Sequence, residues 1–165
     1  MNDMSRSEAI AKIWTLIRDT KIAMLTTHSI HGLHSRPMAT QELEFQGELW
    51  FLSRQQSSKV DEIEHGGMVN LTYVNSGAHA YVSLSGRAEL SQERARIDEL
   101  WKPMHMAWFP LGKDDPEIMV IKVTVDEAEY WDAPGNALVR SYQLLKAVVT
   151  QGKSKVGDHQ KVALD

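Results

Sequence analysis

The sequence contains no cysteine among its 165 residues. This absence excludes disulfides, thiolate nucleophiles and zinc or iron–sulfur centres held by cysteine. Any redox chemistry is therefore expected to come from a bound cofactor.

Long apolar runs and strong charge are also missing. No stretch approaches the roughly 18 apolar residues of a membrane span, and the charged residues 1–8 do not resemble a signal peptide. The net charge of -4 is mild and spread along the chain, so the sequence does not indicate a basic patch that would bind nucleic acid. We interpret the basic residues near the C-terminus (Lys146, Lys153, Lys155 and Lys161) as a solvated tail rather than a nucleic-acid arm. A cytoplasmic protein without membrane or nucleic-acid partners is expected.

Three common catalytic signatures are absent as well. The chain has no G-x-S-x-G nucleophile elbow, no Walker A loop and no G-x-G-x-x-G fingerprint. Hydrolase, P-loop NTPase and Rossmann dehydrogenase interpretations lose their usual support.

Short β-branched and aromatic runs separated by turn residues dominate the chain. They predict strands over 22–27, 33–44, 48–53, 68–74, 78–90, 119–125 and 129–132, with a bulge at Gly86. Helical spacing predicts helices over 5–18, 57–65, 91–101 and 137–149, the first opened by a capping box of Ser5 and Glu8. The pattern predicts a mainly β (α+β) fold, a six- or seven-stranded antiparallel barrel with peripheral helices. Residues 1–150 are expected to form one domain and residues 151–165 a flexible tail.

A phosphate-binding set is present in the first half of the chain. Arg36 supplies a cation on a predicted strand, and Ser57, Ser58 and Lys59 open a predicted helix. Cations, hydroxyls and free N–H groups at a helix start are the donors that a phosphate needs. The same residues also fit an ordinary helix cap with solvated surface charges. Spacing alone leaves both interpretations open.

Other residues are ambiguous. His28, His31 and His34 recur every third residue, but they cross a predicted turn, so we expect no metal site there. Pro37 cannot donate to a ladder and indicates a sheet edge, a bulge or a ligand contact. The apolar segment 108–112 is either a lid over a pocket or part of a dimer seam.

Four stretches, taken in order, resemble a known family: residues 23–27 (AMLTT), 35–38 (SRPM), 50–53 (WFLS) with 57–59 (SSK), and 129–132 (EYWD). Over residues 22–132 the chain resembles the FMN-binding split barrels of the pyridoxamine 5'-phosphate oxidase-like family, especially their general stress protein branch. The resemblance implies an FMN cofactor at the seam of a homodimer. It implies that the phosphate binds to Arg36, Lys59, Ser58 and the adjoining Ser57. The ring would face the backbone around Pro37 and Met38, and Leu52 and Ser53 would continue that wall. Tyr81 and Trp131 would reach the flavin of the partner subunit.

The chain departs from true pyridoxamine phosphate oxidases at several positions. It has Ser58 where they carry a second arginine and Tyr81 where they carry a glutamine, and residues 132–136 lack their substrate-binding arginine and histidine. We therefore expect an FMN-dependent oxidoreductase of an unknown small molecule rather than an enzyme that makes pyridoxal phosphate. Tyr81 or His105 could serve as an acid or base. The alternatives are a non-catalytic flavin-binding or flavin-sensing stress protein, or a barrel that uses deazaflavin or haem.

Overall fold

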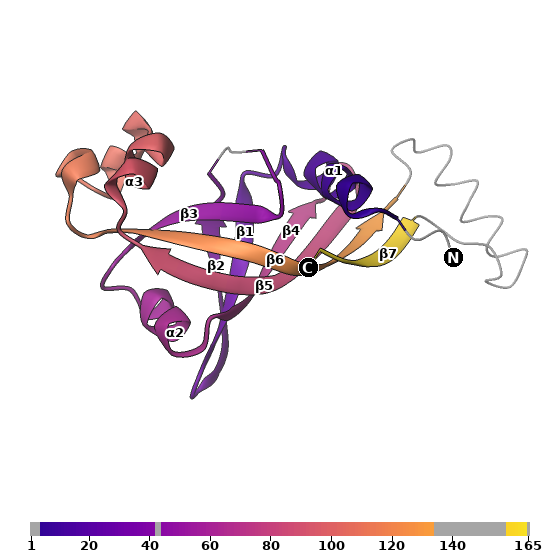
Figure 1. Ribbon diagram of the computed structural model, residues 1–165, viewed down its shortest axis with the longest axis horizontal. Helices are drawn as coiled ribbons and strands as arrows, with labels where there is room; N and C mark the ends of the chain where they lie inside the picture. Colours follow the sequence, from indigo (N-terminus) through magenta and orange to yellow (C-terminus); the bar gives the residue numbers. More distant parts are fainter. Residues whose placement is uncertain (1–3, 42–43, 134–157, 165) are drawn as a thin grey trace, which may run out of the picture.

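The computed structural model describes residues 4–41, 44–133 and 158–164. Within these ranges the chain forms one antiparallel sheet of seven strands with helices at its periphery (Figure 1). The strands are β1 (Ile22–Ser29), β2 (Gly32–Ala39), β3 (Glu48–Arg54), β4 (Met68–Asn75), β5 (Ala80–Ser91), β6 (Ile118–Asp132) and β7 (Asp158–Ala163). The helices are α1 (Arg6–Ile17), α2 (Ser58–Gly66) and α3 (Arg94–Leu100), with the short 3₁₀ helices η1 (Pro103–Ala107) and η2 (Gly112–Asp114).

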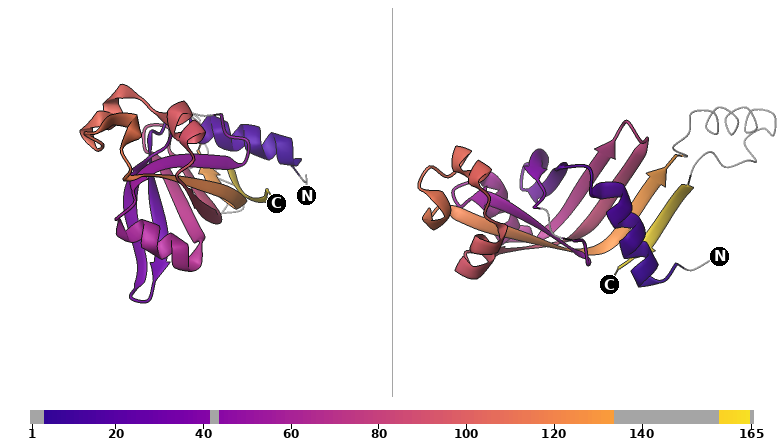
Figure 2. Two further views of the ribbon diagram at one scale, coloured as in Figure 1. Left: turned by 60° about the vertical axis from the view of Figure 1, so that its left-hand side comes forward. Right: turned by 90° about the horizontal axis from the view of Figure 1, so that it is seen from above.

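The sheet is organised around the long strand β6. Neighbouring strands follow the order β2-β1-β4-β5-β6-β3. Strand β5 pairs along one edge of β6, whereas β3 pairs with residues 118–124 and β7 with residues 127–132. Helix α3 and the 3₁₀ turns lie at one end of the sheet, and α1 and β7 lie toward the other (Figures 1 and 2). This open sheet with peripheral helices is the mainly β split barrel that the sequence predicts.

A bulge bends the β5–β6 pair. Val125 and Glu127 are the partners of Gly86 and Ser85, so Asp126 is an extra residue on β6. A Cβ on Gly86 would lie 2.1 Å from the carbonyl oxygen of Thr124, so only glycine fits this close approach. The bulge predicted at Gly86 is confirmed. The two strands predicted over 119–125 and 129–132 are instead one strand, because the bulge interrupts the side-chain alternation without ending the pairing.

Other boundaries differ from the predictions. Residues 158–163 form β7 on the edge of β6, so the expectation of a flexible tail is wrong for this segment. Strand β2 ends at Ala39 rather than at residue 44. Helix α3 has Glu93 at its N-cap position, two residues later than the predicted Ser91. The predicted helix over 137–149 lies outside the described residues.

Two apolar clusters form the core. The larger one joins the inner side chains of the sheet to the buried face of α1 (Ala9, Ile10, Ile13 and Ile17) and to Ile63 of α2. The smaller one lies under α3 and includes Ile97, Leu100 and Phe109. No helix in the described ranges is long and apolar enough to cross a membrane.

Candidate functional site

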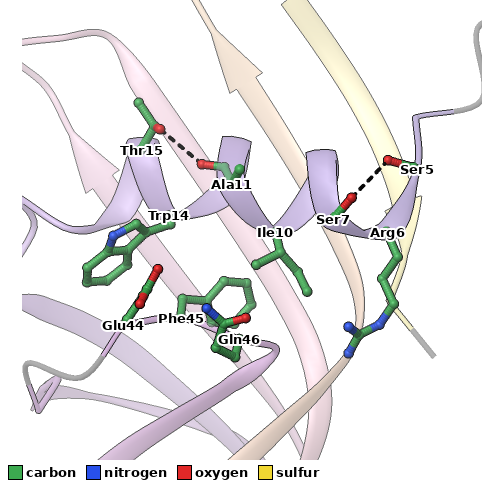
Figure 3. A pocket seen from close by; sticks show the side chains of 10 residues that line it. All are labelled: Ser5, Arg6, Ser7, Ile10, Ala11, Trp14, Thr15, Glu44, Phe45 and Gln46. Atoms are coloured by element: carbon green, nitrogen blue, oxygen red, sulfur yellow. Dashed lines mark hydrogen bonds between the residues drawn. The ribbon is translucent and has the colours of Figure 1, made fainter.

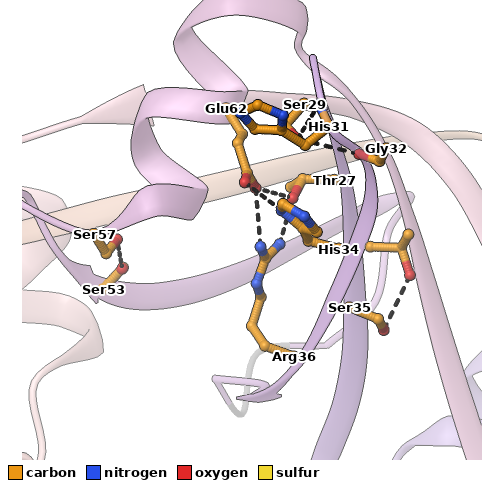
Figure 4. Close-up of polar contacts among 11 residues, drawn as sticks. Thr27, Ser29, His31, Gly32, His34, Ser35, Arg36, Ser53, Ser57 and Glu62 are labelled. Carbon is orange, nitrogen blue, oxygen red and sulfur yellow. Dashed lines mark hydrogen bonds and ion pairs between the residues drawn. The ribbon is translucent and has the colours of Figure 1, made fainter.

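Four polar side chains meet where α2 covers the β1–β2 hairpin (Figure 4). The Nη2 of Arg36, on β2, lies 2.9 Å from Oε2 of Glu62 on α2. The Nη1 of Arg36 donates to the hydroxyl of Thr27 on β1, which in turn donates to Glu62. His34 on β2 has its Nδ1 2.8 Å from the other carboxylate oxygen of Glu62. We call these four residues the Glu62 cluster.

Strand alternation explains why three of these side chains share one face. Leu25 of β1 is fully buried, and Thr27, two residues later, points the same way and is 2% exposed. The cross-strand partners of Leu25 and Thr27 are Arg36 and His34. Because opposite residues of an antiparallel pair lie on the same face, both β2 side chains reach the side that α2 covers.

The cluster holds a buried negative charge. The carboxylate side chain of Glu62 is 7% exposed. The hydrogen bond from Thr27 is the largest cause that lowers the pKa of Glu62 to about 2, assisted by His34 and Arg36 and opposed by burial. Glu62 is therefore ionised at neutral pH.

Lys59 lies close to this cluster on the first turn of α2. Burial is the main cause that lowers the pKa of Lys59, and the charge of Arg36 lowers it further, whereas Glu62 raises it. Lys59 and Glu62 are three residues apart on α2 and lie on neighbouring parts of one helix face, and Arg36 contacts Glu62.

Two serines border the start of α2. Ser57 is the N-cap residue, but its hydroxyl makes no cap hydrogen bond and lies 3.1 Å from the hydroxyl of Ser53 on β3. The carbonyl of Ser57 accepts from the N–H groups of Val60 and Asp61. The preceding N–H groups of the first turn have no intrahelical acceptor, as at any helix start. Ser58 is exposed there.

The other residues predicted to contact the flavin lie in different parts of the structure. Pro37 is exposed on the edge strand β2, which confirms the edge prediction, whereas Met38 belongs to the main core. Leu52 packs against the smaller core cluster. Tyr81 and Trp131 are cross-strand partners on β5 and β6, and they do not join the Glu62 cluster.

The C-terminal strand reaches one of these residues. The imidazole of His159 on β7 stacks on the indole of Trp131, with ring centroids 5.0 Å apart and planes at 7°. His159 also lies 2.8 Å from the carboxylate of Glu129. The segment predicted to form a flexible tail therefore packs against Trp131.

The structure also shows the surroundings of the histidines that the sequence offers as metal ligands or as an acid or base. No group of three potential metal-ligating side chains occurs in the part of the chain that the structure describes. His34 has an acidic partner, Glu62, which its sequence neighbours do not reveal. His105 accepts the N–H of Lys102 through Nδ1 at 2.9 Å and contacts the edge of Trp101. Burial, and then the charge of Lys102, lower the pKa of His105, which belongs to η1 and caps its start through the contact with Lys102.

A separate groove of about 710 Å³ lies between α1 and residues 44–46 (Figure 3). Ile10, Trp14 and Phe45 provide its apolar lining, and Arg6 and Glu44 lie at its border. None of the residues predicted from the sequence to bind a ligand lines it. The groove is therefore separate from Arg36 and Lys59.

Sequence reasoning missed Glu62 and Thr27. Glu62 follows Lys59 by three residues and precedes the buried Ile63, so helical spacing places all three on neighbouring parts of one face. Thr27 continues the inward alternation of β1. Both patterns are visible in the sequence, but neither indicates which β2 side chains meet them.

Comparison with known proteins agrees with this fold. A family model described as pyridoxamine 5'-phosphate oxidase like matches residues 8–155. The chain belongs to the pyridoxamine 5'-phosphate oxidase-like family. General stress protein 26 of Bacillus subtilis is 25% identical over 133 residues, which cover 79% of this chain and 93% of that protein.

Solved structures of the family are also similar. A candidate general stress protein 26 from Jannaschia sp. CCS1 has a TM-score of 0.77 at 24% identity and covers 95% of this chain and 99% of its own. The general stress FMN/FAD binding protein of Xanthomonas citri has a TM-score of 0.69 at 26% identity, with 79% and 92% of the two chains covered. The resemblance to this family and to its general stress proteins is therefore confirmed.

Proposed function

We propose that this protein binds FMN and that Arg36 and Lys59, the phosphate clamp, hold its phosphate. The observation that carries the proposal is the contact of Arg36 with Glu62, one turn after Lys59 on α2, which puts both cations near the start of that helix. A structural neighbour from Xanthomonas citri is an FMN/FAD binding protein, which supports a flavin as the ligand. When bound, FMN would supply the hydride or electron transfer that the side chains of this chain lack.

The donors around the clamp fit a phosphate monoester. Arg36 donates one hydrogen bond from each terminal nitrogen to the Glu62 cluster, which leaves Nε–H and one N–H on each terminal nitrogen for a ligand. The first turn of α2 adds backbone N–H groups and a favourable dipole. The hydroxyls of Ser57 and Ser58 complete a set suited to an anion, and the Ser57 hydroxyl lies 3.1 Å from that of Ser53. The backbone around Pro37 and Met38, with Leu52 and Ser53, would continue from this set along the ring.

We also propose that the site is completed in a homodimer. Tyr81 and Trp131 lie away from the clamp, so they would contact the flavin of the partner subunit rather than that of their own chain. Several large apolar side chains surround them on the same exposed sheet face, including Ile22, Met24 and Val74. An exposed apolar face of this kind is typical of subunit contacts.

Sedimentation tests the dimer directly. The protein should sediment at micromolar concentration with about twice the chain mass of 18.7 kDa. A mass near that of one chain would contradict the dimer. Co-expression of Arg36→Ala and Trp131→Ala chains adds a finer test, because the mixed dimer should retain one intact flavin site.

The phosphate clamp is tested by comparing FMN with riboflavin, which has the same ring without the phosphate. Charge-assisted hydrogen bonds contribute roughly 1.5–3 kcal/mol, so Arg36→Ala or Lys59→Ala should weaken FMN about tenfold to a hundredfold. Riboflavin affinity should stay unchanged. Arg94→Ala, which removes an exposed cation paired with Asp114, is the control. An equal loss of both ligands, or no loss of FMN, would contradict the assignment.

The same preparation distinguishes an oxidoreductase from a non-catalytic flavin-binding protein. In an oxidoreductase, NADH or NADPH should reduce the bound flavin and an acceptor should reoxidise it repeatedly. Tight flavin binding without turnover would favour the non-catalytic alternative.

A further inference from the structure

We infer that Glu62 is a positioning residue, which holds the guanidinium of Arg36 in the orientation that binds phosphate. The inference rests on the proposed function and deepens it. Its unusual feature is that a carboxylate, which repels phosphate, would nevertheless increase affinity for a phosphate ligand.

The contacts of Glu62 come from two strands. Thr27 of β1 donates to the carboxylate, while Arg36 and His34 of β2 contact it at 2.9 and 2.8 Å. A buried carboxylate is costly unless such partners satisfy it. With these partners in place, the Glu62 side chain has one well-defined position between the helix and the hairpin.

This fixed carboxylate in turn restricts Arg36. The Nη2 group is bound to Glu62, and Nη1 is bound to Thr27, which itself donates to Glu62. The Arg36 side chain is still 20% exposed, so its remaining N–H groups can meet a ligand. An arginine held in this way loses less conformational freedom on binding than a mobile one.

Glu62 could affect phosphate binding in two opposing ways, by repelling the phosphate or by positioning Arg36. The two effects predict opposite changes in affinity when Glu62 is replaced. If repulsion dominates, any removal of the charge tightens phosphate binding. If positioning dominates, removal of the whole side chain weakens it, whereas an amide that still accepts hydrogen bonds does not. Glu62→Ala and Glu62→Gln therefore separate the two effects.

The experiment measures FMN and riboflavin affinity of both variants in the full-length protein by flavin fluorescence. Glu62→Ala should weaken FMN about threefold to tenfold, the factor expected from ordering one long side chain, and leave riboflavin unchanged. Glu62→Gln should bind FMN at least as tightly as the wild type. Glu64→Ala, which removes an exposed carboxylate from the same helix, should change neither ligand.

Three outcomes would overturn the inference. Tighter or unchanged FMN binding by Glu62→Ala would mean that Glu62 does not position Arg36. An equal loss of FMN and riboflavin would mean that Glu62 supports the fold. Weaker FMN binding by Glu62→Gln, equal to that of Glu62→Ala, would mean that the charge itself is required.

Thr27→Val provides a second route if Glu62→Ala does not fold. Valine has the shape of threonine without the hydroxyl that joins Arg36 to Glu62, so it should selectively weaken FMN in the same direction by a smaller factor. Unchanged FMN affinity in this variant would contradict the inference. If Arg36→Ala and Lys59→Ala discriminate FMN from riboflavin but the Glu62 and Thr27 variants do not, only the positioning role fails. If the clamp variants do not discriminate, the proposed function fails first.

Discussion

Helices α1 and α2 both pack on the sheet, but they bury different kinds of side chain. The buried residues of α1 are Ala9, Ile10, Ile13 and Ile17, all of them apolar. Those of α2 are Val60 and Ile63 together with the charged Glu62. Apolar side chains stabilise the fold by burial alone, whereas a buried charge is tolerated only when partners pair with it and hydrogen-bond to it. The difference indicates that α1 mainly stabilises the fold, whereas α2 also organises a binding site.

The N-termini of the two helices differ in the same sense. In α1 the hydroxyl of Ser5 accepts from the N–H of Glu8, and the Glu8 carboxylate accepts from the N–H of Ser5, so the predicted capping box is confirmed. In α2 the hydroxyl of Ser57 faces Ser53 instead of the helix end. The side chains of α1 thus satisfy its own backbone, while those of α2 leave its first turn available to a ligand.

The largest expected effect is a change in the apolar face of α1. Ile13 is fully buried in the main core, so Ile13→Ala should lower the free energy of unfolding by about 2–5 kcal/mol. The affinity ratio of FMN to riboflavin should not change, because α1 does not contribute to the clamp. Urea unfolding and flavin titration measure the two quantities. Thr15→Ala, on the exposed face of α1, is the control. An altered ratio of FMN to riboflavin affinity in Ile13→Ala would contradict the view that α1 stabilises the fold without contributing to the site.

Much of this fold could be predicted because local patterns agree with it. Strand alternation, turn residues and the Ser5 capping signal predict most elements within a few residues. The errors have physical causes. The bulge at Asp126 interrupts the alternation within β6, and β7 is stabilised by pairing with a distant strand rather than by its own residues.

The site could be predicted only in part. A cation on a strand and the start of a helix are visible in the sequence, and they predict Arg36, Ser57 and Lys59 as phosphate contacts. The role of Glu62 depends on the packing of α2 against β1 and β2, and no local pattern encodes that contact. On a helix surface, Glu62 looks the same as its exposed neighbours Asp61 and Glu64.

A smaller effect is expected from acid. The pKa of Glu62 in the folded protein is about 2, below the ordinary value of 4.5, so its ionised form stabilises the fold at neutral pH. This contribution is fully present above the ordinary value and is lost as the pH falls toward 2. Between pH 5 and pH 2 the wild type should therefore lose more stability than Glu62→Gln, by up to about 3 kcal/mol. Denaturant unfolding across this range measures the difference.

The matching carboxylate of α1 is the control for this acid effect. Hydrogen bonds to Ser5 lower the pKa of Glu8, but Glu8 is exposed to solvent. Glu8→Gln should therefore follow the wild-type pH profile more closely than Glu62→Gln does. Parallel profiles for the wild type and Glu62→Gln would contradict the buried charge in α2.

The smallest expected effects compare the two N-cap serines. The Ser5 hydroxyl caps α1, so Ser5→Ala should cost about 1 kcal/mol of stability and leave flavin affinity unchanged. The Ser57 hydroxyl makes no cap hydrogen bond, so Ser57→Ala should change the stability of the flavin-free protein by less than about 0.5 kcal/mol. Because the same hydroxyl borders the proposed phosphate site, Ser57→Ala should weaken FMN more than riboflavin. Thermal unfolding and flavin titration of both variants measure the comparison. A stability loss in Ser57→Ala equal to that in Ser5→Ala, without a change in FMN affinity, would assign both serines the same capping role and remove the distinction between the helix ends.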